Sequence, residues 1–255
     1  MPLKNFEGHV AIVTGAGQGI GYEIVKHLST QGASIILNDI EHRLTHQATR
    51  EINETGGNAV PMPGDASDVA LIHAMVDEAV SRFGKLTLAV ANAGLSLFGD
   101  FFEFTPESFT RVVDVNMKAT FFLAQAAAAQ MKKQESGGSI LFTSSAVGHQ
   151  AHKNLAAYSM TKAGIEMLAK NLVAELSQYH ININCVSPGA TLTERTISDP
   201  DYEGTWQRLN PTGRASTAAE VAKAALFLLS PSSRQITGQS LIIYGGWSSV
   251  GPSPY

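Results

Sequence analysis

The stretch VTGAGQGIGYEI (13–24) decides the fold. It follows the apolar run HVAIVT (9–14), precedes residues with helical spacing, and carries a glycine at every second position: Gly15, Gly17, Gly19 and Gly21. Ile20 stands where the fingerprint G-x-G-x-x-G has its third glycine, so the pattern is G-x-x-x-G-x-G instead. Glycines between a strand and a helix allow a tight turn, close approach of a pyrophosphate and close helix packing. They predict a dinucleotide site, with a turn that binds no ligand as the alternative.

Composition limits the other possibilities. The chain has 255 residues, 44% of them hydrophobic and 16% charged, which predicts a single globular domain over residues 1–255. A net charge of −4 argues against nucleic acid or an anionic membrane as a partner. The single cysteine, Cys185, cannot form an intramolecular disulfide. Neither a signal peptide nor a membrane-spanning stretch is evident, so we expect a cytoplasmic protein.

Strand-like and helix-like segments alternate along the chain. Short apolar runs occupy 9–14, 34–39, 58–62, 86–94, 139–145, 183–189 and 240–246, and helical spacing occupies 19–31, a stretch ending near 54, 68–83, 105–133, 156–179 and 217–229. This alternation predicts an α/β, Rossmann-like, doubly wound parallel sheet of seven strands with helices on both faces. Pro61 in NAVPM (58–62) and Pro63 just after it indicate a strand end or an edge strand. The irregular segment 190–215 is predicted to be a substrate-lid insertion.

Asp39 ends the second predicted strand, 18 residues after Gly21. That is close to the interval of about 20 residues at which an acid binds the adenosine ribose of NAD. A carboxylate there would repel the 2′-phosphate of NADP, and no lysine or arginine lies between Gly15 and Lys26. The pattern predicts NAD as the cofactor. A cap on the following helix is the alternative role for Asp39.

Tyr158 and Lys162 lie four residues apart in a predicted helix, on one face. Such a pair alone is usually a surface feature. Combined with TGxxxGIG near the start, Asn92-Ala93-Gly94, Asn116, Ser145 and Pro188-Gly189, it makes the whole chain resemble the short-chain dehydrogenase/reductase family. Ala91 departs from the asparagine that many members carry there, which we expect to affect strand packing rather than chemistry.

The resemblance implies hydride transfer between an alcohol or carbonyl and nicotinamide, with Asn116, Ser145, Tyr158 and Lys162 as the catalytic residues. Tyr158 would exchange the proton, Ser145 would bond the substrate oxygen, and Asn116 would hold a water that connects Lys162 to solvent. A lysine cation about 4 Å away would bring the tyrosine pKa, ordinarily near 10, down toward neutrality. The resemblance also implies the cofactor-binding residues: Gly15, Gln18, Gly19, Ile20, Gly21, Asp39, Asp65, Ala66, Asn92, Ala93, Gly94, Tyr158, Lys162, Pro188, Gly189, Thr191 and Thr193.

Substrate specificity would reside in the segments 95–104, 146–155 and 190–210. Polar or stacking groups there, above all Ser96, His149, His152 and Trp206, favour a sugar or polyol with a secondary or anomeric hydroxyl. A 3-oxoacyl thioester reductase and a hydroxysteroid or other secondary-alcohol dehydrogenase remain open. An NAD-binding regulator without turnover is the non-enzyme alternative, against which the full catalytic set argues. We expect no metal. The alanine-rich helices 105–133 and 156–179 allow close packing, and the resemblance to the family implies that they pair between subunits in a homotetramer.

Overall fold

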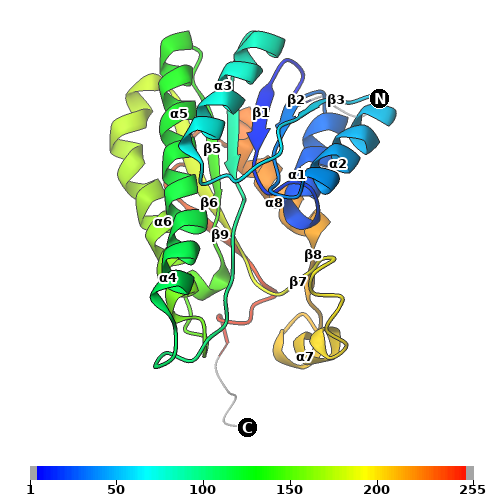
Figure 1. The fold of residues 1–255 in the computed structure, drawn as a ribbon, viewed down its shortest axis with the longest axis vertical. Coiled ribbons are helices and arrows are strands. Elements are labelled where there is room, and N and C mark those ends of the chain that lie inside the picture. Colours follow the sequence, from blue (N-terminus) through cyan, green and yellow to red (C-terminus); the bar gives the residue numbers. More distant parts are fainter. Residues whose placement is uncertain (1–4, 251–255) are drawn as a thin grey trace.

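The computed structural model describes residues 5–250. Strands and helices follow one another in the order β1 (Val10–Val13), α1 (Gly19–Thr30), β2 (Ser34–Leu37), α2 (His42–Glu54), β3 (Asn58–Pro61), α3 (Val69–Phe83), β4 (Leu88–Ala91), α4 (Pro106–Val113), α5 (Ala119–Gln134), β5 (Gly138–Thr143), α6 (Ala156–Leu176), β6 (Ile181–Pro188), β7 (Thr191–Leu192), α7 (Tyr202–Leu209), β8 (Ser216–Thr217), α8 (Ala218–Leu229) and β9 (Ser240–Ile243). Figure 1 shows the sheet between two groups of helices.

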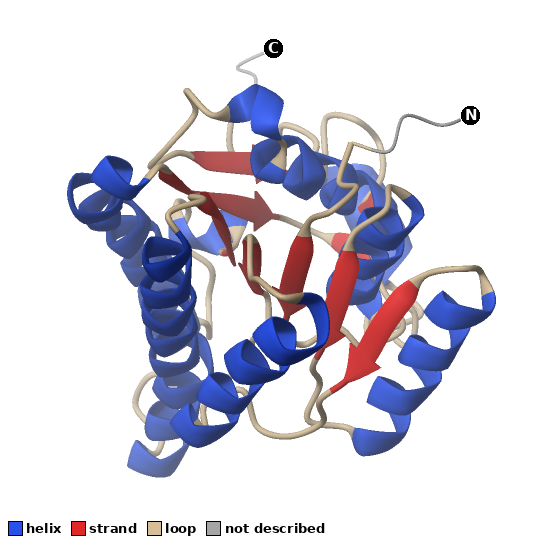
Figure 2. Cartoon of the chain, turned by 90° about the horizontal axis from the view of Figure 1, so that it is seen from above, coloured by secondary structure: helices blue, strands red, loops and turns tan. Residues whose placement is uncertain are grey.

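The main sheet has seven strands in the order β3-β2-β1-β4-β5-β6-β9. Every pairing in it is parallel, which confirms the predicted α/β doubly wound sheet. Seen from above, the strands fan out with the usual twist (Figure 2). The strand that ends at Pro61 lies at one edge, as its prolines predicted. The strand order reverses between β1 and β4, and such a switch point opens a crevice at the carboxyl ends of the strands.

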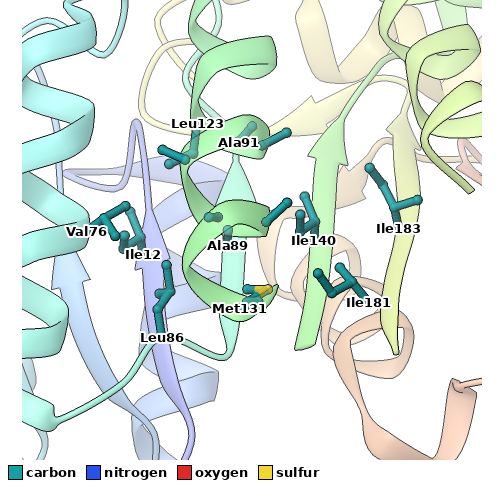
Figure 3. Close-up of a cluster of buried hydrophobic side chains, with 14 of the residues drawn as sticks. Ile12, Val76, Leu86, Ala89, Ala91, Leu123, Met131, Ile140, Ile181 and Ile183 are labelled. Carbon is teal, nitrogen blue, oxygen red and sulfur yellow. The ribbon is translucent and has the colours of Figure 1, made fainter. Parts of the chain in front are cut away.

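Alternate residues of each strand supply two hydrophobic clusters, one on each face. Val10 and Ile12 of β1 pack on the face covered by α3, α5 and α6, whereas Ala11 and Val13 pack on the face covered by α1, α2 and α8. In Figure 3, Ile12, Ala89 and Ile140 from neighbouring strands meet side chains of the covering helices. Burial on both faces explains why the strands are apolar throughout rather than alternating.

Short polar signals define where several helices begin. The Asp68 side chain accepts a hydrogen bond from the backbone N–H of Ala70 and so caps α3. Thr105 caps α4 in the same way, with Pro106 in its first turn. The predicted helix over 105–133 is not continuous, however, because Asp114–Lys118 forms a π-helical turn between α4 and α5. Such turns are frequent at functional sites because they redirect side chains within a helix.

The segment 190–215 is more regular than the sequence predicted. Its first residues form β7, which pairs in parallel with β8 to make a separate two-stranded sheet, and α7 lies between them. The Tyr202 hydroxyl of α7 accepts a hydrogen bond from the Thr191 N–H at 3.1 Å, which attaches the helix to the start of β7. This segment lies at the lower end of Figure 1. Across residues 5–250, no helix is both long enough and apolar enough to cross a membrane.

Candidate functional site

A cavity of about 940 Å³ lies at the carboxyl ends of the strands. It extends from the turn after β1, across the ends of β2 and β4, to the first turns of α6. Every cofactor-binding residue implied by the resemblance lines it, together with Ser145 and Ser96. Residues that the sequence analysis did not single out line it too, among them Asn38, Glu107, Arg111, Asp114 and Tyr202. Of these residues, only Asn38 could have been identified from the sequence, because it directly precedes Asp39 at the end of a predicted strand.

The glycine-rich turn is shaped by close backbone contacts. Gly15 has φ of +61°, and a Cβ there would lie 2.7 Å from the Cα of Ala93. A Cβ on Gly21 would collide with the backbone oxygen of Gly15 and lie 2.5 Å from the amide nitrogen of Asn92. That amide donates to the carbonyls of Thr14 at 3.1 Å and Gly15 at 2.8 Å, so Asn92 braces the turn through its side chain.

The first turn of α1 presents open backbone donors to the cavity. Gln18 is the N-cap residue, and no side chain caps the helix. No acidic side chain lies in the first turn either. A helix N-terminus carries partial positive charge and unpaired N–H groups, which together suit an anion such as a pyrophosphate.

Asp39 holds its carboxylate at the edge of this cavity. Oδ2 accepts a hydrogen bond from the Gly17 N–H at 2.9 Å, and Oδ1 accepts one from the Glu41 N–H at 3.1 Å. The N-cap of α2 is Glu41, so Asp39 does not cap that helix. Asp65 also lines the cavity, and its Oδ1 accepts from the Ser67 N–H at 2.8 Å. The side-chain Oδ1 of Asn38 is buried there without a hydrogen-bond partner, an unused acceptor at the same end.

Tyr158 and Lys162 extend from the first turns of α6 into the cavity beside Ser145. The Lys162 Nζ lies 5.4 Å from the centroid of the Tyr158 ring and donates to the Thr143 carbonyl at 2.7 Å. Burial raises the pKa of Tyr158, and a hydrogen bond with Ser145 and the Arg195 charge offset only part of that rise. Burial also lowers the pKa of Lys162 to about 8. The direction is opposite to the fall expected from the lysine, because desolvation outweighs the hydrogen bond with Ser145 and the charge of Arg195.

Asn116 lies in the π-helical turn and is fully buried. Its Oδ1 accepts from the Leu95 N–H at 2.8 Å, and its Nδ2 donates to the Leu95 carbonyl and to the Thr161 hydroxyl, both at 3.0 Å. It does not line the cavity. The side chain thus ties the segment after β4 to α6, one residue before Lys162.

Three of the four predicted substrate residues lie away from this cavity. His149 instead contacts the Glu166 carboxylate, with 2.8 Å between its Nε2 and Oε2. His152 packs edge-on against Phe98, and its Nδ1 lies 2.8 Å from the Lys153 carbonyl. Trp206 packs edge-on against Trp247. Their positions follow from local partners that the sequence pattern did not reveal, and Ser96 alone of the four lines the cavity.

The lid segment is braced by a chain of threonines. The Thr196 hydroxyl donates to the Thr191 carbonyl at 2.9 Å and accepts from the Thr193 N–H at 2.8 Å. Glu194 and Arg195, which lie between these anchors, line the cavity with charged side chains. His42 and His46 lie one turn apart on α2, but residues 5–250 contain no group of three His, Cys, Asp or Glu side chains suited to a metal ion.

Comparison with known proteins agrees with this geometry. A family model described as Enoyl-(Acyl carrier protein) reductase matches residues 15–248. The chain is 35% identical over 251 residues to L-rhamnose-1-dehydrogenase of Scheffersomyces stipitis, covering 94% of this chain and 95% of that one. It is 33% identical over 242 residues to 7alpha-hydroxysteroid dehydrogenase of Escherichia coli, covering 94% of each.

A solved structure of a short-chain type dehydrogenase/reductase from Mycobacterium marinum superposes with a TM-score of 0.92 at 31% identity. The match covers 97% of this chain and 98% of that one. The fold, the cavity at the switch point and these relatives agree. The chain belongs to the short-chain dehydrogenase/reductase family and is an oxidoreductase that acts on CH–OH groups.

Proposed function

We propose that the protein is an NAD-dependent dehydrogenase that oxidises a secondary or anomeric hydroxyl of a small polyhydroxylated molecule, a sugar or a polyol. One observation carries the proposal: the residues expected at the cofactor line a single cavity together with Ser145, Tyr158 and Lys162. Bound nicotinamide would supply the hydride chemistry. The protein would supply binding, orientation and proton transfer.

The residues present fit a dinucleotide. The uncapped N-terminus of α1 and the glycine-rich turn suit a pyrophosphate, and the Asp39 carboxylate suits the hydroxyls of the adenosine ribose. Asn38 Oδ1, buried without a partner, suits a donor on the adenosine half. The Asp39 charge favours NAD over NADP, since a 2′-phosphate would meet a fixed anion there.

Proton transfer is assigned to Tyr158. Its hydroxyl would take the proton of the substrate alcohol, while Ser145 would hydrogen-bond the same oxygen and hold it in place. Lys162, already bonded to Thr143, would stabilise the phenolate with its positive charge. Burial raises the pKa of Tyr158 in the cofactor-free state, so activation depends on the positive charges that gather when the site is occupied.

A polyhydroxylated substrate is supported by the polar lining beyond Tyr158. Ser96 contributes a hydroxyl to the cavity, and Arg195 contributes a guanidinium whose charge acts on Tyr158. An apolar substrate would desolvate such groups without offering partners, at about 1–3 kcal/mol each. The similarity to L-rhamnose-1-dehydrogenase also supports a polyhydroxylated substrate.

A hydroxysteroid substrate is the second candidate. An apolar hollow of about 350 Å³ lies between the start of α4 and the start of α6, lined by Phe101, Phe104, Phe109 and Met160 among others. Phe98, Phe101 and Phe102 are largely exposed in the neighbouring segment. These surfaces, and the similarity to two hydroxysteroid dehydrogenases, favour an apolar substrate.

The two candidates are separated by a substrate panel. We would measure kcat/KM with NAD and with NADP for aldoses, polyols, hydroxyacids, hydroxysteroids and acetoacetyl thioesters. The proposal expects an aldose or polyol with NAD to give the highest value. A steroid or thioester that exceeds every polyhydroxylated compound by tenfold would overturn the substrate assignment, and absence of turnover with all of them would favour the regulator.

A further inference from the structure

A buried carboxylate lies on α6, next to the proposed catalytic residues of that helix. Glu166 follows Lys162 by one turn of α6, so the two side chains lie on the same face of the helix. Residue Glu166 is 8% exposed and Lys162 is 3% exposed. Isolated buried charges are costly, so a carboxylate at this depth requires partners.

Three side chains contact the Glu166 carboxylate. The hydroxyls of Ser187 and Ser240 donate to Oε1 at 2.7 Å and 3.1 Å, and His149 lies 2.8 Å from Oε2. Ser187 belongs to β6 and Ser240 to β9, so α6, two strands and the segment after β5 all meet at this group. These contacts join the carboxylate to three other segments of the fold and hold its position.

Glu166 is the buried carboxylate that acts on the charge of Lys162. The ionisable groups around it are Lys162 and Lys170 on its own helix, His149 after β5, and the Cys185 thiol on β6. Burial raises the pKa of Cys185 far above the neutral range, so the thiol stays uncharged. Burial lowers the pKa of Lys162 to about 8, and Cys185 and Glu166 act against that fall. Because the thiol stays uncharged, we assign the opposing effect to Glu166.

We propose that Glu166 is a positioning residue for the dehydrogenase reaction, whose carboxylate, fixed by Ser187, Ser240 and His149, is the counter-charge that keeps Lys162 protonated beside Tyr158. The proposal rests on the proposed function for the role of that lysine. Glu166 lies one turn from Lys162 and two turns from Tyr158, so it favours the lysine ammonium more than it disfavours the phenolate. His149, with 33% of its side chain exposed, covers the carboxylate on the solvent side.

The test measures the protonation of Lys162 directly in the cofactor-free protein. Lysine labelled with 13C at Cε is titrated by NMR, with the Lys162 signal assigned from the variant Lys162→Arg. Glu166→Gln keeps the shape of the side chain and removes its charge. We expect the Lys162 midpoint to fall by about one pH unit, because the buried lysine loses the opposite charge one helical turn away.

Matched variants separate charge from structure. Glu166→Asp retains the charge and should restore most of the midpoint, and Glu175→Gln, an exposed glutamate on the same helix, should leave it unchanged. Glu166→Met is a second neutral replacement, and it leaves the Ser187 and Ser240 hydroxyls bonded to each other at 2.6 Å. It is used if Glu166→Gln does not fold, since an apolar residue of similar volume often replaces a buried charge without loss of stability.

An unchanged Lys162 midpoint in a folded neutral variant would overturn the proposal. Because the titration needs neither cofactor nor substrate, it distinguishes this failure from a failure of the proposed function, which would show as absent turnover in the wild type. In the active enzyme, the loss of charge should lower kcat at least threefold for Glu166→Gln and not for Glu175→Gln. Equal kcat in wild type and Glu166→Gln would also contradict the proposal.

Discussion

Replacing Asp39 by asparagine tests the basis of cofactor choice. The carboxylate is fixed by the backbone N–H groups of Gly17 and Glu41, so it cannot swing away from an incoming phosphate. Asparagine keeps the size of the side chain and one acceptor oxygen but removes the charge. The variant therefore isolates electrostatic repulsion from changes in the shape of the turn.

The magnitude follows from Coulomb's law. Two unit charges about 4 Å apart at an effective dielectric of about 20 interact by roughly 4 kcal/mol. If screening leaves a third of that, about 1.4 kcal/mol remains, which is tenfold in affinity. Wild type should prefer NAD over NADP by at least tenfold in kcat/KM. Asp39→Asn should narrow this ratio to about threefold or less. The kcat/KM with NADP should rise because the repulsion is lost, and that with NAD should fall because its ribose hydroxyls lose an acceptor.

The assay is steady-state formation of the reduced cofactor with each dinucleotide, supported by fluorescence titration of NADH and NADPH binding. Glu41→Gln is the matched control, since Glu41 is exposed two residues further along the same loop. That variant should leave the ratio within about twofold of the wild type. A wild-type preference for NADP, or an unchanged ratio in Asp39→Asn, would refute the electrostatic account.

Three further predictions concern stability and assembly. Asn116→Ala should lower the free energy of unfolding in urea by on the order of 3 kcal/mol, because it leaves the Leu95 N–H and carbonyl and the Thr161 hydroxyl without their partner; a loss below about 1 kcal/mol would show that water replaces it. Arg214 holds the pKa of Glu220 to about 2, below its unfolded value of ~4.3, so the pair stabilises the folded state above pH ~4.3 and loses that effect as the pH falls toward about 2. The Tm difference between wild type and Glu220→Gln should accordingly shrink over that range, and a constant difference would contradict the assignment. Light scattering at micromolar concentration should give a homotetramer, since Phe121 of α5 and Met167 of α6 expose apolar side chains, and a monomer would disprove this.

The strands and the cofactor end of the site were predictable because local chemistry dictates them. Apolar runs that end in glycine or a polar residue are characteristic of strands buried on both faces, and seven such runs became seven parallel strands. Gly15 and Gly21 are required by backbone approaches that any Cβ would block. The turn of α6 brings Tyr158 and Lys162 onto one face, so their spacing alone predicted their juxtaposition.

The remaining features depend on contacts between distant segments. The sequence predicts Asn116 inside one helix over 105–133, because the residues on both sides of the π-helical turn are helix-forming. His149 lies between Ser145 and Tyr158 in sequence, yet Glu166, one turn beyond the active-site lysine, draws its ring away from the cavity. The upward direction of the Tyr158 pKa has a similar origin, since sequence spacing reveals the cation but not the depth of burial.

The central claim is that Tyr158 transfers the proton in an alcohol dehydrogenase reaction. Its most direct test is single-turnover formation of NADH by Tyr158→Phe, using the best substrate of the panel, with NADH affinity measured in parallel. The phenylalanine keeps the ring beside Lys162 and removes only the hydroxyl. We predict a fall in the single-turnover rate of at least a thousandfold, within the 10²–10⁴-fold range of general acid–base catalysis, with NADH affinity within threefold of the wild type. A Tyr158→Phe enzyme that retains a tenth or more of the wild-type rate would contradict the account.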